Sequence, residues 1–95
     1  QVLDYLDATG QAYEAFWLRT SDGYEIDLVL ERGGERWAIE VKLTTTPTTA
    51  DIARLDKTAD LIAADRRFLV SQTRRVVDGG RTVSCDLPWL IEQLG

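Results

Sequence analysis

The stretch from Tyr24 to Leu43, YEIDLVLERGGERWAIEVKL, predicts the centre of the fold. On both sides of Gly33-Gly34, apolar and charged residues alternate, which is the period-two pattern of half-buried strands. The apolar positions are Ile26, Leu28 and Leu30 before the glycines, and Trp37, Ile39, Val41 and Leu43 after them. A Gly-Gly pair between two such runs is typical of a two-residue hairpin turn. We therefore expect an antiparallel hairpin whose paired positions sum to 67.

This register gathers charged side chains on one patch of the hairpin. Asp27 falls opposite Glu40, and Glu25 falls opposite Lys42. Cross-strand Cβ atoms lie roughly 5 Å apart, so two carboxylates at such positions repel each other. Lys42, a proton shared by the carboxyl groups, or a divalent metal ion with oxygen ligands would relieve that repulsion. The metal is the most informative of these three hypotheses, and a one-residue slip in register would remove it.

Asp27, a spacer of twelve residues, and then Glu40-Val41-Lys42 resembles the D…(D/E)-x-K signature of the PD-(D/E)XK phosphodiesterases, the restriction-endonuclease-like superfamily. The longer string from Trp17 to Lys42 resembles the uncharacterised C-terminal domain that follows the ATPase module in many bacterial and archaeal AAA-type ATPases. The signature is short, so its weight comes from the placement of its charges on adjacent strands. The resemblance implies a restriction-endonuclease-like core and an upstream AAA-type ATPase domain in the same chain.

The resemblance also implies a role for each residue of the motif. Asp27 and Glu40 would bind Mg²⁺ or Mn²⁺, with the carbonyl of Val41 as a third ligand. Lys42 would orient the attacking water and stabilise the charge of the transition state. Glu25 is either an outer acid of the catalytic site or the ion-pair partner of Lys42. The alternative for the whole set is a half-exposed sheet face that carries charges at alternate positions.

Departures from the signature leave two functions open. Active relatives carry a further glutamate on the first helix, where this chain offers only Asp4 and Asp7, and Ile26 stands where the signature has proline. The first function is a metal-dependent DNA phosphodiesterase, a nuclease associated with the AAA-type ATPase. The second is a catalytically inactive nuclease-fold module that binds DNA or a protein partner for that ATPase. A glutamate upstream of Gln1 would favour the first.

Composition narrows the chemistry. The 95 residues predict a single domain over residues 1–95, and the absence of an initial methionine suggests a piece of a longer protein. The chain has no histidine and one cysteine, Cys85, which excludes an internal disulfide, a Ser-His or Cys-His nucleophile pair and the usual zinc ligands. No run reaches the roughly 18 apolar residues of a membrane helix, so we expect a cytoplasmic protein without membrane contact.

The net charge of −5 argues against a surface that coats nucleic acid, although an acidic metal site would account for part of it. Arginines concentrate in the last third of the chain, where Arg66-Arg67, Arg74-Arg75 and Arg81 indicate either a local basic ridge or ordinary solvated charges at strand ends. The apolar surroundings of Trp17, Trp37 and Trp89 favour core positions over base-stacking platforms.

The remaining chain predicts an α/β domain of the α+β type with a mixed sheet. A helix over residues 1–9 ends at Gly10, and a strand over 12–20 turns at Asp22-Gly23 into the central hairpin, completing a three-strand antiparallel meander. Thr48 and Asp51 predict a capping box for a crossover helix, which leads to a parallel strand over 67–71. A terminal hairpin over 75–85 and a helix capped by Asp86 complete the expected order.

Overall fold

The computed structural model describes residues 2–10, 12–19 and 25–95, so the predicted turn at Asp22-Gly23 lies outside the described residues. In chain order the elements are α1 (Val2–Thr9), β1 (Glu14–Arg19), β2 (Glu25–Arg32), β3 (Glu35–Val41), α2 (Thr49–Leu61), β4 (Arg66–Val70), β5 (Val77–Asp78), β6 (Thr82–Cys85) and α3 (Leu87–Leu94). This order agrees with the order expected from the sequence.

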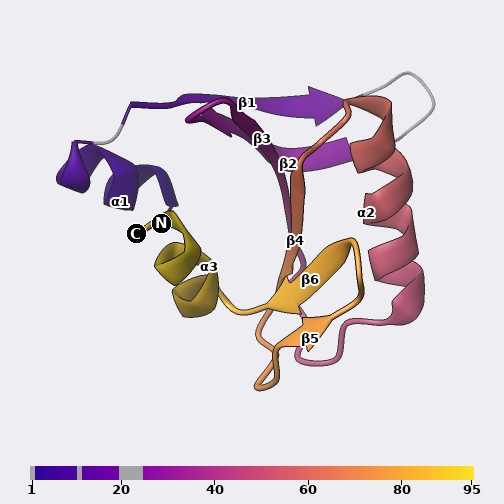
Figure 1. The fold of residues 1–95 in the computed structure, drawn as a ribbon. Coiled ribbons are helices and arrows are strands. Elements are labelled where there is room, and N and C mark those ends of the chain that lie inside the picture. The colour runs from indigo at the N-terminus through magenta and orange to yellow at the C-terminus, as the bar shows by residue number, and fades with distance from the viewer. Residues whose placement is uncertain (1, 11, 20–24) are drawn as a thin grey trace.

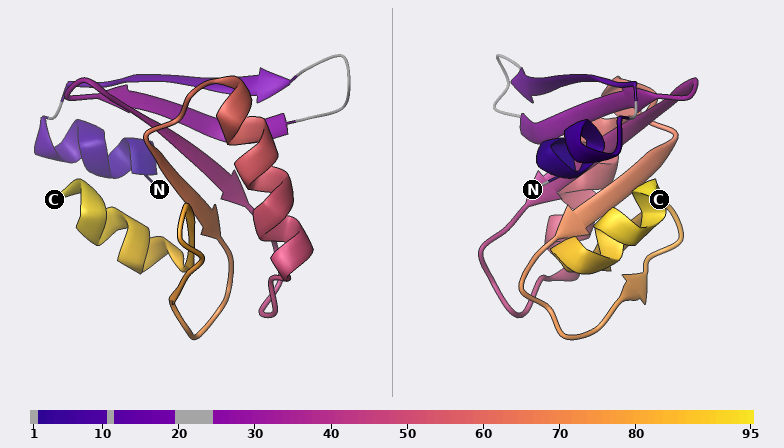
Figure 2. Two further views of the ribbon diagram at one scale, coloured as in Figure 1. Left: turned by 45° about the vertical axis from the view of Figure 1, so that its right-hand side comes forward. Right: turned by 90° about the vertical axis from the view of Figure 1, so that its left-hand side faces the viewer.

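One mixed sheet lies between two layers of helix. The strand order across it is β1-β2-β3-β4-β6-β5. Strands β1, β2 and β3 are antiparallel neighbours, β4 is parallel to β3 after the crossover helix α2, and β5 and β6 form the terminal hairpin. Helix α2 covers one face of the sheet, whereas α1 and α3 cover the other (Figures 1 and 2). The predicted α+β fold with a mixed sheet is confirmed.

The central hairpin has the predicted register. Leu28 pairs with Ile39 and Arg32 pairs with Glu35, so paired positions sum to 67. Gly33 and Gly34 form the turn with φ of 55° and 80°. Two successive positive φ angles are the geometry of the tight hairpin turn that glycine permits without a steric penalty.

Strand β2 contains a bulge that the alternating pattern did not predict. The pairs on either side of it are Phe16 with Val29 and Leu18 with Ile26. Trp17 alone therefore faces both Asp27 and Leu28. An extra residue in one strand of a pair reverses which face the following side chains point to. Ile26 and Leu30, which an unbroken alternation would place on one face, consequently lie on opposite faces of the sheet.

The sheet divides the core into two clusters. On the side of α1 and α3, the buried cluster consists of Leu6, Leu30, Trp37, Ile39, Phe68, Val70, Cys85, Leu90 and Leu94. On the side of α2, it consists of Ile26, Val29, Ala38, Leu55, Ala59, Ala64 and Leu69. The expectation that Ile26, Leu28, Ile39 and Val41 are buried together is thus wrong. The bulge sends Ile26 to the α2 side, and Val41 is 50% exposed near the end of the sheet.

Side-chain caps fix where the last two helices begin. Thr48 and Asp51 form the predicted capping box, in which each side chain accepts the backbone N–H of the other residue at 3.2 and 2.9 Å. The Asp86 carboxylate accepts the N–H of Trp89 at 3.0 Å and caps α3. Both caps satisfy backbone donors that the first turn of a helix leaves unpaired.

Strand β1 is an edge strand with little cover. Trp17 is 67% exposed and Phe16 is 44% exposed, so the prediction that Trp17 is a core residue is wrong. The alternation of aromatic residues suggested a strand covered on both faces, but the helices that form those covers lie over the more central strands (Figure 2). Trp37 is buried and Trp89 packs against the core, as predicted.

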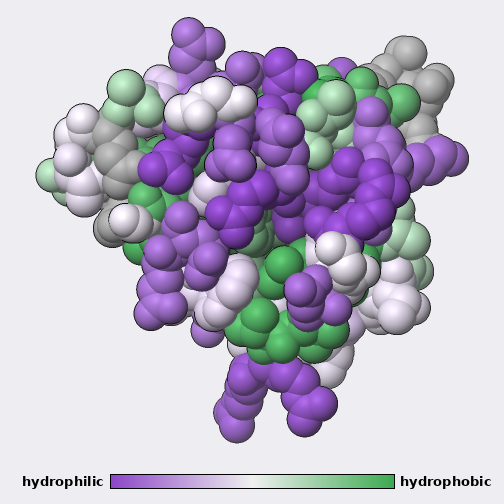
Figure 3. Space-filling view, viewed as in Figure 1, coloured by the Kyte–Doolittle hydropathy of each residue, from purple (hydrophilic) through white to green (hydrophobic). Residues whose placement is uncertain are grey.

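The molecular surface is largely hydrophilic. Figure 3 shows polar residues over most of one face, with an apolar patch over the β5–β6 region, where Val76 and Val77 are exposed. Among the described helices, none is both long and apolar enough to cross a membrane.

We predict that Ile39→Asp unfolds the domain. Ile39 is 2% exposed within the cluster that joins the sheet to α1 and α3. An unpaired charge at this position should lower the free energy of unfolding by roughly 3–5 kcal/mol or more. Leu43→Asp is the matched control, because Leu43 is 86% exposed. A cooperative thermal melt of Ile39→Asp equal to that of Leu43→Asp would contradict this description of the core.

Candidate acidic site

Two carboxyl groups meet at the end of the sheet where β2 begins and β3 ends. Asp27 lies in the bulge of β2, and its Oδ2 atom accepts the backbone N–H of Val41 at 2.9 Å. The carboxyl group of Asp27 is also hydrogen-bonded to that of Glu40. The two acids of the sequence motif are therefore in direct contact.

This contact changes the acidity of Glu40. Burial, the hydrogen bond with Asp27, and the negative charges of Asp27 and Glu25 together raise the pKa of Glu40 from 4.5 to about 8, against the opposing effect of Lys42. At neutral pH, Glu40 is accordingly protonated for most of the time. Of the three ways to relieve the repulsion between these carboxylates, the raised pKa of Glu40 indicates the shared proton.

Lys42 points to a different acid from the one expected. Its Nζ atom lies 2.9 Å from Oδ1 of Asp51, and this hydrogen bond lowers the pKa of Asp51 below its usual value. Glu25 instead pairs with Arg19, its neighbour on β1, at 3.1 Å. The pairing of Glu25 with Lys42 is thus wrong, because Lys42 follows the end of β3, where the first turn of α2 comes within reach.

A hollow of about 540 Å³ lies between the end of the sheet and α2. Glu40 lines this hollow, whereas Asp27 lines two neighbouring ones. The charged residues that line the hollow beside α2 are Glu25, Glu40, Lys42, Asp51 and Arg54. The hollow thus combines acids that can bind a cation with bases that can bind an anion. Such a mixture suits a phosphate group that arrives with a divalent metal ion.

Arg54 is the residue of this hollow that the sequence reasoning missed. It is exposed on α2, and within the described part of the chain its guanidinium has no hydrogen-bond or ion-pair partner. Residues three apart on a helix share a face, so Arg54 lies on the same side of α2 as Asp51. Because Thr48 and Asp51 predict the start of the helix, the three-residue spacing from Asp51 could have identified Arg54 from the sequence.

Of the two acids of the first helix, only the side chain of Asp7 is described, and it does not join this site. The side chain of Asp4 lies outside the described part of the structure. Asp7 accepts the hydroxyl proton of Tyr13 at 2.8 Å, and Tyr13 lines a hollow near the Gly33–Gly34 turn, at the other end of the hairpin. Asp7 is therefore engaged at a distance from the acidic pair.

The donor set fits a divalent cation bound by few protein ligands. Among the described residues, no group of three or more acidic, histidine or cysteine side chains is arranged to hold a metal ion. Mg²⁺, however, is commonly held by one or two carboxylates together with water and substrate phosphate. The N–H of Val41 points to β2, and strand geometry directs its carbonyl to the same side. Asp27, Glu40 and the carbonyl of Val41 therefore supply oxygen donors on one side of β3.

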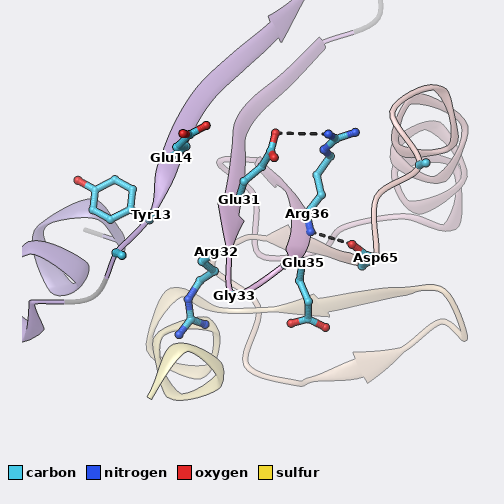
Figure 4. Close-up of a pocket in the computed structure, with 11 residues that line it drawn as sticks. Tyr13, Glu14, Glu31, Arg32, Gly33, Glu35, Arg36 and Asp65 are labelled. Atoms are coloured by element: carbon cyan, nitrogen blue, oxygen red, sulfur yellow. Dashed lines mark hydrogen bonds and ion pairs between the residues drawn. The ribbon is translucent and has the colours of Figure 1, made fainter.

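The hollow at the hairpin turn is less suited to chemistry. It measures about 690 Å³, and Figure 4 shows that charged groups of opposite sign already pair across it. Arg36 binds Glu31 through its guanidinium at 3.4 Å, and its backbone N–H donates to Asp65 at 2.8 Å. These contacts join β2, β3 and the segment before β4, which indicates a structural role.

Two of the clustered arginines are structural as well. Arg67 is buried and binds Asp56 and Asp60 of α2, at 3.4 and 2.7 Å. Arg81 also binds Asp60, and the two arginines lower the pKa of that carboxyl group. These pairs attach α2 to β4 and to the terminal hairpin, so Arg67 and Arg81 belong to that network and not to an uninterrupted basic ridge.

Comparison with known proteins gives one result. The family model of a domain of unknown function, DUF4143, matches residues 1–90. No curated protein and no solved structure gives a significant match.

We predict that the protonated Glu40 makes stability depend on pH. Because the folded state raises the pKa of Glu40 to about 8, the metal-free protein should lose free energy of unfolding as pH rises from about 4.5 to 8 and level off above that range. Glu40→Gln should match the wild type near pH 5 and exceed it near pH 9 in chemical denaturation with chelator. Glu14→Gln, which removes an exposed carboxylate from β1, should follow the wild type. Parallel pH profiles for wild type and Glu40→Gln would contradict the shared proton.

Proposed function

The chain belongs to the DUF4143 family, and we propose that it is a metal-dependent phosphodiesterase that cleaves DNA. The observation that carries this proposal is the contact between Asp27 and Glu40, two acids that hold a proton in place of a cation. Strongly perturbed pKa values cluster at functional sites, and a bound cation would relieve the repulsion between these carboxylates once the proton is lost. The resemblance of the motif to that of the PD-(D/E)XK nucleases supports the same conclusion.

In this proposal, Asp27, Glu40 and the carbonyl of Val41 bind Mg²⁺ or Mn²⁺. When bound, the cation would supply Lewis-acid stabilisation of a phosphoryl oxygen and a water of lowered pKa. The N–H of Val41 holds the Asp27 carboxylate in a fixed orientation, which reduces the reorganisation needed on binding. Glu40 must lose its proton before both of its oxygens can act as ligands.

Two cations of the chain would act on the substrate. Lys42 would exchange Asp51 for the attacking water or a phosphoryl oxygen, since it lies next to Glu40 in sequence and lines the same hollow. The Arg54 guanidinium has no partner among the described residues, lies on the α2 wall and would bind two non-bridging phosphate oxygens in a bidentate manner. Donors aimed at developing charge are the principal means of accelerating phosphoryl transfer.

We further propose that the domain works with an AAA-type ATPase of the same chain. This rests on the resemblance of the string from Trp17 to Lys42 to the domain that follows such ATPases. A second function, a catalytically inactive module that binds DNA or a protein for that ATPase, is favoured by one observation. Among the described residues, no third acid joins Asp27 and Glu40 in a ligand cluster, and Asp7 binds Tyr13 instead.

Thermal melts with and without metal test the ligand role of Asp27. In chelator, Asp27→Asn should be neutral or slightly stabilising, because it relieves repulsion and its amide oxygen can still accept the Val41 N–H. Millimolar Mn²⁺ should stabilise the wild type by mass action, by about 2.7 kcal/mol at 100 times the Kd, and leave Asp27→Asn almost unmoved. Glu92→Gln, an exposed acid on α3, should respond like the wild type.

Cleavage of plasmid DNA separates the two functions. Lys42→Ala should retain the Mn²⁺-induced shift and lose cleavage, because Lys42 acts on the substrate and not as a metal ligand. A wild-type melt that Mn²⁺ does not shift would exclude the metal-dependent enzyme. A Mn²⁺ shift without any cleavage would favour the inactive module.

A further inference from the structure

Trp17 is an aromatic side chain that the described part of the protein leaves largely uncovered. It is 67% exposed on the edge strand β1, whereas Trp37 is buried and Trp89 packs against the core. Phe16 and Leu18 pair with residues that face α2, so the side chain between them points to the opposite side of the sheet. An indole in this position adds little to the core of the described structure.

The bulge places this indole beside Asp27. Trp17 lies directly across from Asp27 and Leu28, on the strand next to β2. A hollow of about 260 Å³ is lined by Trp17, Leu18, Arg19, Glu25, Ile26 and Asp27. Asp27 is therefore shared between the candidate metal site and a hollow that has an exposed aromatic wall.

Arg19 orders this wall. Its guanidinium carbon lies 5.6 Å from the centre of the Trp17 ring and its Nε atom lies 3.1 Å from Glu25. A cation over an indole is attracted to the negative face of the ring, and the ion pair holds that cation in place. One face of Trp17 thus meets Arg19, which adds positive charge next to an aromatic surface.

We propose that Trp17 is a positioning residue that stacks an unpaired base of the nucleic-acid strand whose phosphate reaches Asp27. This inference rests on the proposed function and specifies its substrate class, namely nucleic acid with unpaired bases beside the cleaved bond. Bases inside a duplex are stacked on both faces, so away from the duplex ends only an unpaired base can leave a face for the indole. Stacking on an aromatic side chain accepts any base, so the preference would be for structure and not for sequence.

Phe16 provides a matched control. It is also aromatic, 44% exposed and on the same edge strand, but it faces the other side of the sheet and does not line the hollow that contains Asp27. If binding depended only on exposed aromatic surface, or on the edge of β1, replacing either Phe16 or Trp17 with alanine would weaken it equally.

The test measures binding of the full chain to fluorescently labelled oligonucleotides in chelator, where cleavage cannot occur. The probes are a single-stranded oligonucleotide and a blunt duplex of the same length. Trp17→Ala should weaken binding to the single strand roughly 5- to 150-fold, the range of one base-aromatic stack, and change duplex binding far less. Trp17→Phe should retain most of the affinity, and Phe16→Ala should bind like the wild type.

Tryptophan fluorescence gives a second measurement that a loss of folding would not mimic. The single strand should quench the emission of the wild type, while Trp17→Phe, which keeps Trp37 and Trp89, should lose that quenching. Equal affinity of wild type and Trp17→Ala for the single strand, or an absence of single-strand binding by the wild type, would overturn the inference. Equal losses in Trp17→Ala and Phe16→Ala would also overturn it, because exposed aromatic surface or the edge of β1 would then account for the binding.

These outcomes are independent of the metal site, because the binding measurements contain chelator. A Trp17-dependent affinity in a protein that Mn²⁺ does not stabilise would retain the stacking role and exclude the nuclease. If Mn²⁺ stabilises the protein and DNA is cleaved, but affinity for the single strand does not depend on Trp17, the nuclease would be retained and the stacking role excluded.

Discussion

The bond from the Val41 N–H to the Asp27 carboxylate is the constraint on which the candidate site depends. The backbone pairing of β2 and β3 ends at Leu28 and Ile39. Beyond that pair, the Asp27 side chain accepts the Val41 N–H in place of a backbone carbonyl of β2. The bulge at Asp27 and Leu28 makes this exchange possible, because it turns β2 away from regular pairing. Asp27 is consequently fixed against β3, next to Glu40.

A second contact connects the site to the start of α2. Asp51 uses one carboxylate oxygen to cap the helix at Thr48 and the other to hold Lys42. The position of Lys42 is therefore tied to the first turn of α2. Arg54, one turn further along, enters the same hollow. The crossover helix thus supplies both a fold element and one wall of the acidic site.

Much of this arrangement could be predicted from local patterns. Two glycines fixed the hairpin register, and a Thr-Asp pair fixed the start of α2, because turn and cap chemistry depend on a few adjacent residues. The bulge in β2 could not be predicted, since nothing in the alternation of Ile26, Leu28 and Leu30 marks an extra residue. Its consequences, the burial of Ile26 against α2 and the place of Trp17 opposite Asp27, were missed with it.

The charge partners were less predictable than the backbone. Opposed positions on neighbouring strands predicted the contact of Asp27 with Glu40, but the same rule wrongly joined Glu25 to Lys42. A long side chain such as that of Lys42 can reach carboxylates on several helices and strands. The distance from Lys42 to Asp51 depends on how α2 packs on the sheet. The exposure of Trp17 likewise depends on which strand forms the edge, which is a property of the whole sheet.

The central claim is that a proton in the Asp27–Glu40 pair occupies the place of a divalent cation. It is tested most directly by the number of protons that the protein releases when the cation binds. Calorimetric titration of Mn²⁺ at pH 7 in buffers of different ionisation enthalpy gives the number of protons released per ion bound. With the pKa of Glu40 at about 8, release should approach one proton at pH 7 and decline toward zero above pH 9. Mn²⁺ binding without proton release at pH 7 would contradict the account.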